Sequence, residues 1–246
     1  MRTFKLILQY DGSRYRGWQR LPDCDRTIQG RLEQTLTKLL GEPVELSGSG
    51  RTDAGVHAMG QAASFRSRTA LTCEDILIGL RQHLPEDIGV LSVTEMPERF
   101  HARLHAVGKV YRYRIWNSEA PCVFERKYVY QLPQPLDLAA MEKAAGFLTG
   151  THDFRSFCAK KSDKKSTVRT VEEIRIERAG EEVRLSFRGN GFLYQMVRIL
   201  TGTLIEVGLH RRRPEEMPAL LEAEDRALAG WTVPAKGLCL MEVLYE

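Results

Sequence analysis

The segment 47–61 contains the residue types best suited to do chemistry. It holds one arginine, Arg51, and one carboxylate, Asp53, among the glycines Gly48, Gly50, Gly55 and Gly60. Because glycine permits a positive φ and a close approach of backbone, this segment is expected to form a tight loop. A loop that presents a carboxylate favours nucleophilic or acid–base chemistry at Asp53. Arg51 could pair with this carboxylate and keep it ionised.

Glycine-rich loops of other kinds do not match this spacing. A dinucleotide fingerprint needs G-x-G-x-x-G, whereas four residues, including an acid, separate Gly50 from Gly55. The closing Gly-Lys-Ser/Thr of a phosphate-binding loop is absent, and residues 48–50 lack the frame of a nucleophile elbow. His57 could act as a general base or could order the loop. An ordinary glycine-rich turn with solvated charges is the alternative interpretation.

Further motifs run along the whole chain in a fixed order. They are LQYDGSRYRGWQ (8–19), GRTDAGVHA (50–58), KVYRY (109–113), HDFRSF (152–157), GFLYQMVRILTG (191–202) and PAKGLCLMEVLY (234–245). Together they closely resemble the TruA family of tRNA pseudouridine synthases. No motif position departs from the pattern of that family.

The resemblance implies roles for particular residues. Asp53 would be the catalytic nucleophile, and Tyr111 would lie against the target base. Arg51 could help to fill the gap left by a flipped base. Arg198 is a charge within an apolar helical stripe, so it needs a partner, and Asp53 is the candidate. The substrate implied is the anticodon stem-loop of tRNA, at positions 38, 39 and 40, modified by a homodimer without any cofactor.

Composition is typical of a soluble globular protein. The chain has 246 residues, of which 43% are hydrophobic and 28% charged. It has no long uncharged apolar run that could span a membrane. Charged residues interrupt the first apolar stretch too early for a signal peptide, so a cytoplasmic location is expected. Five scattered cysteines without a CxxC pair argue against disulfides and a zinc site, so no metal is expected.

Basic residues gather in three places, although the net charge is only +4. Any one cluster is more simply a solvated surface, but three clusters with nearby aromatic residues favour a groove for a polyanion such as RNA. The proposed RNA-binding residues are Arg14, Arg16, Arg20, Lys160, Lys161, Lys164 and Lys165, and the third cluster is Arg211, Arg212 and Arg213.

Hydrophobic periodicity predicts an α+β protein with two similar halves, 1–105 and 106–246. Both halves read as strand, helix, strands, helix, strand, which favours duplicated ferredoxin-like (split βαβ) units with antiparallel sheets. Helices are expected at 28–40, 74–84, 137–148, from about 192 to 208, and at 214–224. Strands are expected at 3–10, 43–47, 61–66, 88–95, 108–117, 170–177, 183–189 and 238–245. The resemblance places the active site in the cleft between the halves.

Isomerisation of uridine to pseudouridine in tRNA is therefore the predicted function. A non-catalytic RNA-binding protein on a ferredoxin-like scaffold is the alternative; it would use the aromatics of KVYRYRI without needing Asp53. A hydrolase acting on nucleotides is a third class, but it would normally need a second acid or a metal near Asp53.

Overall fold

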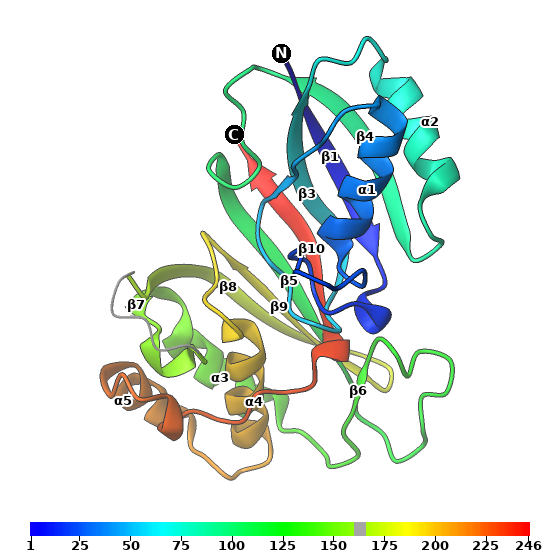
Figure 1. Ribbon diagram of the computed structural model, residues 1–246. Coiled ribbons are helices and arrows are strands. Elements are labelled where there is room, and N and C mark those ends of the chain that lie inside the picture. Colours follow the sequence, from blue (N-terminus) through cyan, green and yellow to red (C-terminus); the bar gives the residue numbers. More distant parts are fainter. Residues whose placement is uncertain (160–165) are drawn as a thin grey trace. The chain divides into compact units, whose positions relative to one another are not determined.

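A computed structural model describes residues 1–159 and 166–246, and the chain forms two compact units (Figure 1). The first unit comprises Met1–Val107 together with Cys239–Glu246, and the second comprises Gly108–Leu238. The sequence placed the last strand with the second half, whereas the structure groups it with the first unit. Within the described residues, no helix is long and apolar enough to cross a membrane.

The first unit is a sheet with strand order β4-β1-β3-β10 and two helices. β1 pairs antiparallel with β3 and β4, β10 pairs parallel with β3, and β2 pairs antiparallel with β3. Alternate residues of β1 (Phe4, Leu6 and Leu8) are fully buried, so this face of the sheet carries the core. The strands are β1 (Arg2–Tyr10), β2 (Ser47–Gly48), β3 (His57–Ser67), β4 (Ile88–Met96) and β10 (Leu238–Tyr245), and the helices are α1 (Ile28–Leu40) and α2 (Cys73–His83).

Local capping sets the ends of both helices. The Thr27 side chain accepts a hydrogen bond from Gly30 N at the start of α1, and Gly41 ends that helix with φ 68°. A capping box of Thr72 and Asp75 begins α2. These ends agree closely with those predicted.

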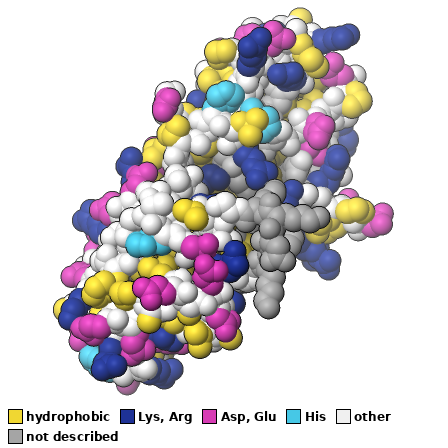
Figure 2. Space-filling model, turned by 90° about the vertical axis from the view of Figure 1, so that its left-hand side faces the viewer, with side chains coloured by type: hydrophobic (Ala, Val, Ile, Leu, Met, Phe, Trp, Pro, Cys, Tyr) yellow, Lys and Arg dark blue, Asp and Glu magenta, His cyan; other side chains and the backbone are white. Residues whose placement is uncertain are grey.

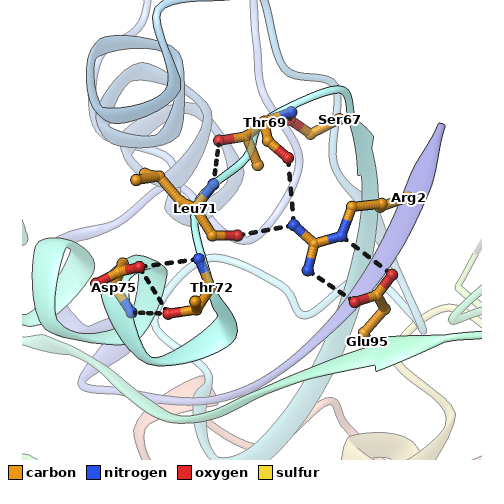
Figure 3. Close-up of polar contacts among 7 residues, drawn as sticks. All are labelled: Arg2, Ser67, Thr69, Leu71, Thr72, Asp75 and Glu95. Atoms are coloured by element: carbon orange, nitrogen blue, oxygen red, sulfur yellow. Dashed lines mark hydrogen bonds and ion pairs between the residues drawn. The ribbon is translucent and has the colours of Figure 1, made fainter.

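Arg2 of β1 fixes the linker between β3 and α2 (Figure 3). Its guanidinium forms an ion pair with Glu95 of β4 at 2.7 Å. It also donates to the carbonyl oxygens of Thr69 and Leu71. One side chain therefore joins two neighbouring strands to the segment that leads into α2.

The described residues of the second unit form a sheet with strand order β5-β9-β8-β7 and three α-helices. The neighbours β5–β9, β9–β8 and β8–β7 are antiparallel, and the short β6 pairs parallel with β5. The strands are β5 (Ala106–Trp116), β6 (Tyr130–Gln131), β7 (Gly150–Asp153), β8 (Val168–Ala179) and β9 (Glu182–Gly189). The helices are α3 (Leu138–Leu148), α4 (Met196–Gly208) and α5 (Met217–Glu222).

The α+β class and the mostly antiparallel pairing are as predicted, while several elements differ from their predicted bounds. β3 begins at His57, before the strand expected at 61–66, and the short β6 and β7 were not expected. The helix expected from about 192 begins at Met196, because Gln195 takes a left-handed conformation (φ 60°) and interrupts any earlier helix. The strand expected at 43–47 is reduced to the two residues of β2. The helix expected at 214–224 is a 3₁₀ turn, Pro214–Glu216, followed by α5. Duplication of a ferredoxin-like unit stays a prediction.

Candidate functional site

The loop that carries Asp53 connects β2 to β3, and the segment after β1 holds its backbone in place. Trp18 N donates to Thr52 O at 3.0 Å, immediately before Asp53. Val56 N donates to Asp53 O at 3.1 Å and closes a turn in which Gly55 has φ 78°. The Asp53 side chain is half-buried. Main-chain bonds on both sides of Asp53 therefore set its position.

A buried polar network supports the start of this loop. Tyr10 OH lies 2.9 Å from the Thr52 hydroxyl, and Gln61 Nε2 donates to Gly50 O at 3.1 Å. The Ser49 hydroxyl donates to Gln61 Oε1 at 2.7 Å. Burial raises the pKa of Tyr10 and keeps its hydroxyl protonated. A buried network in which each of these groups has a partner rigidifies the loop.

His57 connects the far end of the loop to the residues that follow β1. Its buried ring accepts a hydrogen bond from Gly12 N at Nδ1 (3.1 Å), and the Asp11 carboxylate lies 3.2 Å from the same nitrogen. Nδ1 makes one of these contacts at a time: it accepts from Gly12 N when it is unprotonated, and it can donate to the Asp11 carboxylate only when it is protonated. Either contact ties the ring to the residues after β1. This favours an ordering role for His57 over a general base.

Two glycines that sequence reasoning did not single out make this packing possible. A Cβ on Gly12 would lie 2.0 Å from Val56 O, and a Cβ on Gly17 would lie 2.7 Å from Thr52 O. Gly17 also has φ 97°, a backbone conformation that residues other than glycine rarely adopt. Their only signal in the sequence is their place in the motif 8–19. Gly48 is required for a similar reason, because its Cβ would overlap the indole of Trp18.

Tyr111 lies on β5 of the second unit and is largely buried. Phe192 meets its ring edge-on, with centroids 5.3 Å apart and planes at 87°. Phe192 lies at the start of the helix expected from about 192 to 208, but it precedes α4 and packs on Tyr111. Tyr113, two residues along the same strand, is fully buried and donates to Pro234 O at 2.8 Å. Tyr113 is therefore a core residue.

Arg198 lies on α4, where it is half-buried. Its Nε donates to Val233 O at 2.8 Å, and Val233 N donates back to Arg198 O at 3.4 Å. These bonds join α4 to the segment before β10. Arg198 belongs to the second unit and Asp53 to the first, so their pairing stays a prediction.

The basic residues of the first unit that were predicted to contact RNA lie on its surface. Arg14, Arg16, Arg20 and Arg51 are all exposed. Arg20 also pairs with Glu33 of α1 at 2.9 Å. In the part of the chain that the structure describes, Arg51 forms no ion pair. The face shown in Figure 2 carries basic and acidic side chains interspersed.

Of the other two basic clusters, the structure describes only Arg211, Arg212 and Arg213. Arg212 pairs with Glu206 at 3.1 Å and with Glu216 at 3.6 Å, so its charge is used within the second unit. Arg213 also pairs with Glu216. The cluster Lys160, Lys161, Lys164 and Lys165 lies outside the described residues. Among the described residues, no group of three or more His, Cys, Asp or Glu side chains is placed to hold a metal ion.

Comparison with known proteins shows which class this fold and loop define. The profile of a family described as tRNA pseudouridine synthase matches residues 6–104 and 144–246. The chain belongs to this family. It is 46% identical over 246 residues to a tRNA pseudouridine synthase A from Moorella thermoacetica, covering 100% of both chains. It is 44% identical over 240 residues to a protein of the same name from Bacillus sp. strain KSM-64, covering 98% of each.

Proposed function

We propose that this protein isomerises uridine to pseudouridine at positions 38, 39 and 40 in the anticodon stem-loop of tRNA, with Asp53 as the catalytic nucleophile. The observation that carries the proposal is the position of Asp53 on a loop pinned by main-chain bonds at Thr52 and Val56. Rigid placement of a nucleophile lowers the entropic cost of reaching the reactive geometry. Family membership and the names of the relatives support the same activity.

The reaction needs little besides a carboxylate. A glycosidic C–N bond breaks, the freed uracil turns, and a C–C bond forms to the same sugar, without redox change or loss of a group. No cofactor is therefore expected. Asp53 would attack the anomeric carbon of the sugar, attack C6 of uracil, or remove the 2′ proton.

The target base must leave the helical stack before it reaches Asp53, at a cost of about a few kcal/mol. We assign Tyr111 as the platform for the flipped base and Arg51 as a side chain that helps to fill the gap in the stem. Arg198 would pair with Asp53 as a counter-ion, in the cleft between two duplicated ferredoxin-like halves. Recognition of neighbouring positions implies that the protein reads the shape and flexibility of the RNA.

Replacing Tyr111 separates the role of its ring from that of its hydroxyl. Tyr111→Ala is expected to lose about 1–3 kcal/mol of interaction with the flipped base, whereas Tyr111→Phe should keep it, because stacking needs only the ring. The measurement is tRNA affinity for both variants, with melting temperatures as a check, since Tyr111 also packs on Phe192. Equal affinity of the two variants would show that Tyr111 acts only through packing in the fold or through its hydroxyl.

The lysine cluster at 160–165 is proposed to bind phosphates, together with Arg14, Arg16 and Arg20. Neutralising Lys160, Lys161, Lys164 and Lys165 together should lower the slope of log affinity against log salt by roughly three units, at about 0.7–0.9 per phosphate contact. The measurement is a binding titration of wild type and the fourfold variant at several salt concentrations. Parallel lines would reject phosphate contacts for this cluster.

The protein is proposed to act in the cytoplasm as a homodimer. One assay distinguishes the three classes of function: purified protein is incubated with a uridine-labelled tRNA transcript, which is scored for pseudouridine and for strand cleavage. Pseudouridine without cleavage is the expected result. Binding with neither product would favour the non-catalytic RNA-binding protein, and cleavage would favour a hydrolase.

A further inference from the structure

Phe124 is the most exposed large apolar side chain among the described residues, at 95% of its full accessibility. It lies between β5 and β6, and its neighbour Val123 is 55% exposed. Single exposed apolar residues are common and need no explanation. The surroundings of Phe124 and Val123 nevertheless distinguish this pair from the other exposed apolar residues.

The segment that presents Phe124 is anchored by hydrogen bonds. Trp116 Nε1 donates to Ala120 O at 2.8 Å before it. After it, the Glu125 carboxylate pairs with Arg114 at 2.7 Å, and Tyr128 N donates to Glu125 O at 2.7 Å. The backbone around Phe124 is therefore held while its ring projects into solvent.

Exposed cationic residues lie close to Phe124 along the chain. Arg126 and Lys127 follow it after Glu125, and the exposed Lys236 donates to Arg126 O at 3.1 Å. Glu119 and Glu125 are the acids of this segment, and Glu125 forms an ion pair with Arg114, which also holds Glu182. An anchored aromatic ring among cations has the chemistry that binds unstacked bases and their phosphates. Lys127 and Lys236 favour RNA over a protein partner, because lysine is depleted at the cores of protein interfaces, whereas phenylalanine and arginine occur in both kinds of interface.

We propose that Phe124 stacks on an unpaired base of the tRNA substrate, while Arg126 and Lys127 contact the phosphates beside that base. The identity of the RNA rests on the proposed function, whereas the stacking role rests on the exposure, the anchoring and the charges of this segment. Phe124 would then contribute to binding and would not touch the reacting atoms.

The test measures the Kd of an unmodified tRNA transcript for four variants. Phe124→Ala is expected to bind about tenfold more weakly than wild type, from the usual contribution of one stacked base. Phe124→Trp should bind within about twofold of wild type, and Phe124→Leu should resemble the alanine variant because it has no ring. Leu104→Ala is the matched control: Leu104 is 75% exposed in the first unit and should leave the Kd unchanged.

Three results would overturn the stacking role. These are an unchanged Kd for Phe124→Ala, retention of affinity by Phe124→Leu, and a changed sedimentation mass of RNA-free Phe124→Ala, which would indicate a protein interface. Because Phe124 makes little contact with the fold, none of these variants should alter folding. Wild-type pseudouridine formation is scored separately, so failure of the proposed function and failure of this stacking role give different outcomes.

Discussion

Asp53→Asn is expected to abolish pseudouridine formation while leaving tRNA affinity within about a few-fold of wild type. The amide keeps the size of the side chain but removes the nucleophile, and phosphate contacts elsewhere carry binding. The loop should keep its conformation, because the bonds from Trp18 N to Thr52 O and from Val56 N to Asp53 O involve only main-chain atoms. The measurements are single-turnover product formation and equilibrium binding of the same transcript.

A second aspartate provides the control for this experiment. Asp25 is exposed in the same unit, so Asp25→Asn removes one negative charge without touching the loop. This variant should retain wild-type turnover. Residual activity of Asp53→Asn above about one per cent of wild type would reject Asp53 as the essential group, since loss of a true nucleophile costs several orders of magnitude.

Arg114→Ala is expected to destabilise the protein by about 3–5 kcal/mol at pH 7, because it leaves a buried carboxylate with too few partners. Glu182 is buried, and Arg114 holds it with two hydrogen bonds of 2.8 Å. Arg184 adds a third contact at 2.7 Å. Burial alone would raise the pKa of Glu182, but the bonds from both arginines outweigh burial and lower the pKa to about 2. The measurement is urea unfolding of wild type and variant.

The pH dependence follows from the sign of this shift. Because the pKa of Glu182 is lower in the folded state than the ordinary 4.5, its contribution to stability is complete above about pH 4.5 and is lost as the pH falls toward 2. The stability difference between wild type and Arg114→Ala should therefore narrow at pH 3. The double variant Arg114→Ala/Glu182→Gln is the control and should recover part of the loss at pH 7, because no buried charge remains. A constant difference across this pH range would contradict the assignment.

Elements whose signals are local can be predicted from the amino-acid sequence alone. The bounds of α1 follow from its apolar periodicity, the Thr27 cap and Gly41. The turn between β8 and β9 follows from Ala179-Gly180, where Gly180 has φ 61°. The glycine-rich segment around Asp53 and the motifs along the chain were also sufficient to indicate the family. Caps, turns and periodicity act within a few residues, so they can be read without knowing the fold.

Contacts between segments that are distant in the sequence could not be predicted in this way and are known only from the folded structure. β10 pairs parallel with β3 and joins the first unit, because its partners are set by long-range hydrogen bonds that no local pattern encodes. Arg212 reads as a solvated charge in the sequence, but Glu206 brings it into an ion pair. Gly12 and Gly17 acquire their importance from the backbone of the Asp53 loop, more than thirty residues away. Steric contact and ion pairing depend on where residues lie in space, and only the folded structure determines those positions.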